Sequence, residues 1–224
     1  MKSRFMILSH PVDTDTPLYG NTPKPEITPI KSIGNGDSSD TYMINICNHS
    51  STHVDAPSHF VHGGRRISDY SIDELTFKNP IIIDIPKKEG DWIEKEDLKG
   101  LNFSNNDCIL FKTGFGKYRT NDVYRLNNPG IAPEVIIFIR KNFHTVSCLG
   151  LDSISISGFK NRERGRESHK VAFKKDEQFG KPLLVIEDMD LNPVKENKLR
   201  QIVVIPWFIK KIDSAPCTVL AEVV

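Results

Sequence analysis

The sequence lacks an excess of charge of one sign. Its 224 residues carry 30 Lys and Arg against 29 Asp and Glu, which gives a formal net charge of +1. Such a balance leaves no net field to draw the chain to nucleic acid or to an anionic membrane surface. We therefore expect a small-molecule substrate, with no nucleic-acid and no membrane partner.

Long hydrophobic runs are also missing. Even the apolar stretch at residues 80–83 meets Asp84 within one short strand, so no segment is long enough to span a bilayer. Near the N-terminus, Ser9, His10 and Pro11 interrupt the apolar stretch before a signal-peptide core forms. We expect no secretion signal and a cytoplasmic protein.

Cysteines are few and widely spaced. The four of them, Cys47, Cys108, Cys148 and Cys217, form no C-x-x-C pair, which argues against a zinc knuckle or a redox dithiol. Three lie in apolar or strand-like runs, where a reduced cysteine behaves as a small hydrophobe. We interpret them as buried structural thiols.

The pattern of apolar residues predicts the fold class. The length suits one substantial core, so residues 1–224 are interpreted as a single domain. Because strand patterns outnumber helical ones and helices come singly between strands, we expect a mixed α/β fold: a barrel-like mixed β-sheet core flanked by helices. Strands are expected at residues 42–46, 80–85, 108–113, 145–151, 181–187, 201–205 and 217–223, and helices at 91–99 and 133–142.

Two stretches are expected to lack regular structure. Residues 11–40 are rich in Pro, Asp, Thr, Gly and Asn and are interpreted as an irregular surface segment. Residues 161–168 mix both signs of charge without aromatic residues between them, which is typical of a solvated loop. We assign this second stretch no nucleic-acid role.

The residues that carry chemistry gather in one segment, His49-Ser50-Ser51-Thr52-His53-Val54-Asp55-Ala56-Pro57-Ser58-His59. Imidazole and carboxylate are side chains that zinc and manganese accept as ligands. In an extended strand His53 and Asp55 share one face, and Pro57 bends the chain so that His59 can return toward them. Crowding these groups without a cation would be costly, so the segment predicts a divalent-metal site.

This segment resembles the signature H-x-G-T-H-x-D-x-P-x-H of the cyclase family of metal-dependent hydrolases, which includes bacterial kynurenine formamidases and isatin hydrolases. Every chemical position matches, and Ser51 replaces the glycine. Weaker stretches follow in the family's order at residues 8–11, 111–115, 149–153, 205–206 and 213–216. The resemblance covers nearly the whole chain and implies a fold of the swivelling β/β/α type.

The resemblance also implies a centre with two divalent metals per chain, zinc or manganese. His49, His53, Asp55 and Glu187 are expected to hold one metal, while Asp55, His169 and Glu187 hold the second, so that both carboxylates bridge. Residues 174–180 look like an insertion between His169 and Glu187. The neighbouring acid Asp188 is the alternative to Glu187.

Two further positions complete the expected active site. His59 matches the family's general acid and base, a role that suits imidazole because its pKa lies near neutrality. Tyr19 stands in the early loop where kynurenine formamidases tend to place a tryptophan, and its ring can stack on an aromatic substrate. No G-x-S-x-G elbow surrounds the nearby serines, which argues against a serine nucleophile.

The expected function is hydrolysis, by a metal-activated water, of an amide or lactam C–N bond other than a peptide bond in a small and possibly aromatic substrate, as in an arylformamidase. Two alternatives stay open. One is a metal-dependent lyase or dehydratase, which its products would distinguish. The other is a metal-binding protein without turnover, against which the intact His59 argues. The resemblance further implies a homodimer or homotetramer in which the early loop crosses to a neighbour's site.

Overall fold

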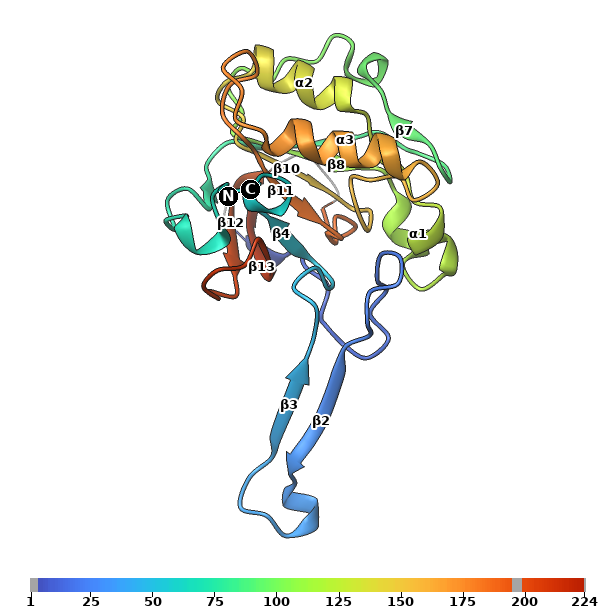
Figure 1. Ribbon diagram of the computed structural model, residues 1–224, viewed down its shortest axis with the longest axis vertical. Helices are drawn as coiled ribbons and strands as arrows, with labels where there is room; N and C mark the ends of the chain where they lie inside the picture. The colour runs from blue at the N-terminus through green and yellow to red at the C-terminus, as the bar shows by residue number, and fades with distance from the viewer. Residues whose placement is uncertain (1–3, 195–198, 224) are drawn as a thin grey trace.

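A single mixed β-sheet organises the molecule (Figure 1). The computed structural model describes residues 4–194 and 199–223. The sheet has nine strands in the order β5-β12-β13-β4-β11-β10-β8-β6, and β1 pairs with β13. The strands are β1 (Arg4–Ile7), β4 (His53–Asp55), β5 (Thr76–Phe77), β6 (Pro80–Asp84), β8 (Cys108–Lys112), β10 (Cys148–Leu151), β11 (Leu184–Glu187), β12 (Leu199–Pro206) and β13 (Ser214–Val223).

The sheet changes from parallel to antiparallel pairing at β4. Strands β6, β8, β10 and β11 run parallel to one another, whereas β4 is antiparallel to both β11 and β13. At the far edge β6 contacts β12, so the sheet curls into a nearly closed barrel. This arrangement confirms the predicted mixed, barrel-like core.

The parallel strands are apolar on both faces because each face meets a separate core. Cys108 and Leu110 of β8 point into the barrel interior, whereas Ile109 and Phe111 point outward. The outward side chains pack under α2 (Pro133–Asn142) and α3 (Arg162–Phe173), which lie side by side over that face (Figure 1). The prediction of a helix at 133–142 and the prediction of three buried cysteines are both confirmed.

Short elements complete the described chain. Two small sheets pair β2 (Glu26–Lys31) with β3 (Thr41–Asn45) and β7 (Trp92–Ile93) with β9 (Gly130–Ile131). No helix of the described residues is long and apolar enough to cross a membrane. The remaining helical elements are α1 (Asp122–Leu126) and the 3₁₀ turns η1 (Ile33–Asn35), η2 (Pro57–His59), η3 (Ile67–Asp69), η4 (Lys95–Leu98) and η5 (Phe115–Tyr118).

The prediction of a solvated loop at residues 161–168 is wrong. Those residues begin helix α3, whose N-cap Asn161 accepts a hydrogen bond from the backbone amide of Arg164 at 3.2 Å. Most of its charged residues are exposed, while Gly165, Ser168 and His169 are buried. A Cβ on Gly165 would lie 2.5 Å from the Ser157 side chain, so glycine lets the helix approach closely.

The predictions for residues 11–40 and 91–99 also need correction. Residues 26–31 are strand β2, which pairs with β3 in an antiparallel hairpin that projects from the body (Figure 1). We call residues 26–45 the arm. Its cross-strand pairing supplies order that local composition does not encode. Residues 91–99 form β7 and the 3₁₀ turn η4 rather than a helix, because Trp92 and Ile93 pair with β9.

Arg140 ties the stretch after α3 to α2. Its side chain is 2% exposed and donates to four backbone carbonyls, those of Val171, Lys174, Gly180 and Lys181. Burial lowers the pKa of the guanidinium, yet the four acceptors satisfy it. Residues 174–180, which the sequence suggests are an insertion, are therefore held at both ends by hydrogen bonds from Arg140.

We expect Arg140→Met to lower the free energy of unfolding by about 3 kcal/mol, because several buried carbonyls lose a charged donor. For a domain of this size the melting temperature should fall by roughly 6 to 12 °C. Lys141→Met, at the exposed neighbouring position, is the matched control in thermal unfolding. Equal melting temperatures for the two variants would contradict the anchoring role.

Candidate metal centre and active site

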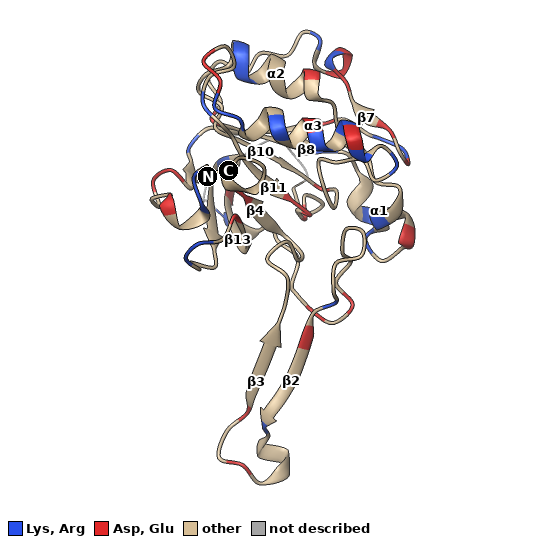
Figure 2. Cartoon of the chain, viewed as in Figure 1, with Lys and Arg blue, Asp and Glu red and all other residues tan. Residues whose placement is uncertain are grey.

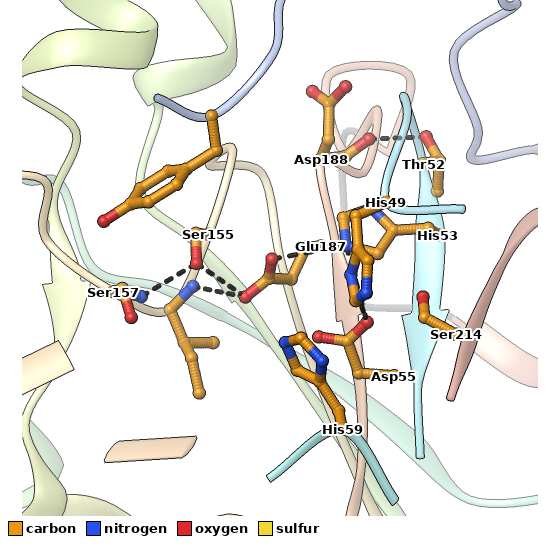
Figure 3. A network of polar contacts seen from close by, with 12 residues as sticks. His49, Thr52, His53, Asp55, His59, Ser155, Ser157, Glu187, Asp188 and Ser214 are labelled. Atoms are coloured by element: carbon orange, nitrogen blue, oxygen red, sulfur yellow. Dashed lines mark hydrogen bonds and ion pairs between the residues drawn. The ribbon is translucent and has the colours of Figure 1, made fainter. Parts of the chain in front are cut away.

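Strand β4 carries the centre of the site in the middle of the sheet. Its residue Asp55 lies opposite Val185 of β11 and Ser214 of β13, and His53 lies opposite Glu187. Because β4 has partners on both edges, its short backbone is held rigidly. The strand alternation turns His53 and Asp55 to the same face, where Figure 3 shows them beside Glu187.

The carboxylate of Asp55 faces two separate groups of nitrogen atoms. Its Oδ1 lies 3.1 Å from His49 Nδ1 and 3.5 Å from His53 Nε2, whereas its Oδ2 lies 3.8 Å from His169 Nε2. Glu187 divides in the same way, with Oε2 3.4 Å from His53 Nε2 and Oε1 3.3 Å from His169 Nε2. The five residues thus form two adjoining donor sets that share both carboxylates.

Backbone carbonyls orient two of the imidazoles. His53 Nδ1 lies 2.8 Å from the carbonyl oxygen of Ser51, and His169 Nδ1 lies 3.1 Å from that of Gly165. With Nδ1–H donated in each case, Nε2 keeps a lone pair that a cation held by the carboxylates could accept, which is the tautomer a metal-binding histidine needs. Glu187 is held in turn, since its Oε1 accepts from Ser155 Oγ and from the backbone amide of Ile156 (Figure 3).

The centre contains buried polar atoms whose hydrogen-bonding capacity the protein alone does not satisfy. Asp55 is fully buried, and neither of its oxygens has a hydrogen-bond partner among the described residues; the same holds for His53 Nε2. Burial would raise the pKa of Asp55, but His49 and His53 hold it well below its usual range. Burial likewise would lower the pKa of His49, but Asp55 and Asp213 raise it to about 10. These orphaned donor atoms fit divalent cations.

His59 lies at the edge of this cluster, at the end of the turn η2. Its Nδ1 is 2.6 Å from Asp213 Oδ2, and the same oxygen is 3.1 Å from His49 Nε2. Burial would raise the pKa of Asp213, but both histidines hold it far below its usual range. An Nδ1–H bonded to a carboxylate leaves His59 Nε2 as a proton acceptor.

Asp213 is the site residue that we did not single out from the sequence. It stands in the 213–216 stretch quoted for the resemblance, directly before β13, and pairing of β13 with β4 brings it to the histidines. His49, His59 and Asp213 also place one possible ligand atom each within 4.8 Å of one another. Acidic residues beside strands are common, so the sequence alone does not mark Asp213 as a site residue. Only the pairing of β13 with β4 does so.

A cavity of about 420 Å³ opens beside the cluster. Its wall includes four of the five expected metal residues, namely His49, His53, His169 and Glu187, but not Asp55. His59, Phe60 and Tyr19 also line it. The Tyr19 ring meets Phe159 edge-on, with 5.5 Å between ring centroids. The structure therefore places these residues around one space, with Asp55 buried directly behind the histidines.

Asp188 takes no part in the cluster. Its backbone has a φ of 52°, in the left-handed region, which turns its side chain away from Glu187. The buried carboxylate accepts hydrogen bonds from Tyr124 Oη at 2.5 Å and from Arg119 Nη2 at 2.8 Å. Because adjacent side chains diverge here, Glu187 and not Asp188 faces the histidines (Figure 3).

Ser51 belongs to the same network. Its φ of 57° is a backbone conformation that glycine adopts more readily, which accounts for glycine in the family signature. The serine hydroxyl accepts from Arg119 Nη2 at 3.1 Å and donates to the carbonyl of His10 at 3.2 Å. These bonds offset the strain and fix the carbonyl that orients His53.

We expect Tyr124→Phe to lower the free energy of unfolding by about 2 kcal/mol, because the buried Asp188 carboxylate loses a donor while the ring packing stays. Tyr118→Phe is the control, since the Tyr118 hydroxyl bonds to no other described residue. Chemical denaturation measures both. If the two variants are equally stable, Asp188 does not depend on the tyrosine.

Comparison with known proteins places this geometry in a family. The Cyclase family model matches residues 6–157. A protein of Haemophilus influenzae without an assigned function is 31% identical over 130 residues, which cover 56% of this chain and 85% of that one. Kynurenine formamidase of Bacillus cereus is 26% identical over 171 residues, or 75% of this chain and 73% of the enzyme.

A solved structure supports the fold over the full length. Isatin hydrolase A from Labrenzia aggregata superimposes with a TM-score of 0.81 at 20% identity, covering 99% of this chain and 94% of the other. The family match spans more than half of the sequence and includes the segment that builds the metal centre. The chain belongs to the cyclase family.

Proposed function

We propose that this protein is a metal-dependent hydrolase that cleaves an amide or lactam C–N bond, other than a peptide bond, in a small and aromatic substrate. One observation carries the proposal: the buried carboxylate of Asp55, without a hydrogen-bond partner among the described residues, lies directly behind the imidazoles of His49, His53 and His169, which line a cavity. Kynurenine formamidase and isatin hydrolase among the similar proteins support the same reaction type.

The metal ligands that we propose follow the two donor sets. His49, His53, Asp55 and Glu187 would hold one cation, and Asp55, His169 and Glu187 would hold the second. We propose two cations per chain, zinc or manganese, since both accept imidazole and carboxylate. When bound, such cations lower the pKa of a water molecule and polarise a carbonyl.

The protein's own residues supply the proton transfers. We propose that His59 Nε2 takes a proton from the attacking water and returns it to the leaving nitrogen, with no covalent intermediate. Asp213 positions the ring and stabilises the imidazolium that forms, because its carboxylate lies 2.6 Å from Nδ1. Tyr19, beside the cavity, would place an aromatic substrate ring by stacking.

The first experiment measures metal content by elemental analysis and turnover of formamide and lactam substrates. We expect about two equivalents of zinc or manganese in the wild type. His59→Ala should keep the metal and lose at least about 100-fold in kcat, whereas Asp55→Asn should lose the metal itself. Asp213→Asn should keep the metal and lower kcat more than it changes KM.

The outcomes separate the roles. A His59→Ala variant that loses metal would make His59 a ligand instead of a proton carrier, since it lies within ligand distance of Asp55 and His169. Absence of bound metal in the wild type would sink the proposed function. Adding zinc or manganese to wild-type protein stripped of its metal should also raise the melting temperature, because ligands that bind only the folded state stabilise it.

We further propose that the protein is a homo-oligomer assembled through the arm. Both strands of the arm are exposed along their whole length, and Ile27 lies opposite Ile44. The arm extends from the body, and its strands carry charge only at the two ends of β2, at Glu26 and Lys31, with none on β3 (Figure 2). A lone two-stranded hairpin is marginally stable in water, so a second copy of this chain is the partner that would bury these isoleucines.

Light scattering tests the oligomer. We expect the wild type to be a dimer or tetramer, and the double variant Ile27→Lys with Ile44→Lys to be a monomer, because charges replace the buried apolar contact. Ile72→Lys changes an isoleucine of the body that is 58% exposed and serves as the control. A monomeric wild type would remove the assembly from the proposal.

A further inference from the structure

Helix α3 presents two arginines to the cavity. Arg162 and Arg166 are four residues apart, and His169 follows three residues later, so all three lie on one helix face. All three line the cavity of about 420 Å³. The helix that supplies a proposed metal ligand therefore also supplies positive charge at the exposed rim of the same space.

The third arginine of the helix, Arg164, differs from these two because it forms ion pairs within the protein. Arg164 forms a two-pronged ion pair with Glu94, at 2.7 and 2.8 Å, and a further one with Glu134 at 3.3 Å. In contrast, neither Arg162 nor Arg166 forms an ion pair with a carboxylate of residues 4–194 or 199–223. The cavity-facing pair is left without a counter-ion among those residues.

The position of Arg162 is defined by its neighbours. Its guanidinium lies over the Phe159 ring, 4.3 Å from the centroid, and a Cβ built on Gly20 would be 3.9 Å from its Nη2. Phe159 also contacts Tyr19 edge-on. Burial raises the pKa of Tyr19, and both Arg162 and Arg166 act to lower it, as expected for two cations near the phenol.

The remaining charge in the cavity wall belongs to Glu187, which the proposed metals would neutralise. A substrate would therefore meet the proposed cations on one side of the cavity and two guanidinium groups at the rim, and the ring of Tyr19 belongs to the same wall. Guanidinium groups match the planar fork of a carboxylate. A volume of about 420 Å³ suits a compound of one aromatic ring with short substituents.

We propose that the substrate carries a carboxylate remote from the scissile C–N bond, and that Arg162 and Arg166 bind it and select against uncharged analogues. This inference rests on the proposed amide hydrolysis and adds the substrate class. The two residues are specificity determinants: they touch the distal group and leave the bond-breaking step to the cluster around Asp55.

The test compares 3- and 4-formamidobenzoate with uncharged formanilide, using the metal-loaded enzyme. We expect kcat/KM for the better carboxylate to exceed that for formanilide by about tenfold or more, and this preference should shrink as salt is added. Arg162→Gln and Arg166→Gln should each reduce the preference by roughly three- to fivefold, and the double variant should abolish it. Turnover of formanilide should change little.

Lys170→Gln is the matched control, since it removes a positive charge from an exposed position of the same helix, where Lys170 pairs with Glu167. It should leave the preference intact. Equal kcat/KM for charged and uncharged compounds in the wild type, or a preference that survives the double arginine variant, would overturn the inference while the hydrolase proposal stands. If neither these formamides nor a lactam is hydrolysed, the proposed function fails, and calorimetric affinities of the same compounds still measure the preference.

Discussion

The negative charge buried on β4 is the constraint around which the rest of the site is arranged. A carboxylate at the centre of a sheet, hydrogen-bonded on neither oxygen among the described residues, is costly unless cations face it. His49, just before β4, and His53, on β4 itself, face one of its oxygens, and His169 of α3 faces the other. Glu187 of β11 divides in the same way between His53 and His169. Without strand pairing on both sides of β4, the strand could shift until the Asp55 carboxylate reached solvent.

The second layer of contacts keeps those ligands in place. Carbonyls of Ser51 and Gly165 set the imidazole orientations, and the Asp188 network fixes the loop that carries Ser51. Asp152 fixes the turn that follows β8 in a similar way, because its carboxylate accepts hydrogen bonds from the backbone amides of Thr113 and Gly114. That bond joins the 111–115 and 149–153 stretches, two of the weak resemblances in the sequence, and gives them a shared physical reason.

Local patterns predicted most of the fold and the metal-site segment from His49 to His59, whereas His169, Glu187 and Tyr19 were expected only from the family resemblance. The segment from His49 to His59 holds its ligands close in sequence, so strand alternation and a turn suffice to predict its geometry. Strands β6, β8, β10 and β11 were predictable because apolar runs reflect burial on both faces. Asp213 was not singled out because only the pairing of β13 with β4 brings it to His59, and that pairing depends on contacts far apart in sequence.

Helix α3 shows how a charge pattern can mislead, because the mixed charges of residues 161–168 predicted a loop where the structure has a helix with one buried face. Its outer face is as polar as a loop, whereas Gly165, Ser168 and His169 are buried against the body. Its closest approach is at Gly165, where an added methyl group would collide with Ser157, so the helix backbone has little freedom to shift. Positions 162 and 166 are exposed, so a changed side chain there would not displace the helix backbone. Descendants of this chain can therefore diverge in what they accept by exchanging rim side chains, while the helix and its histidine stay where they are.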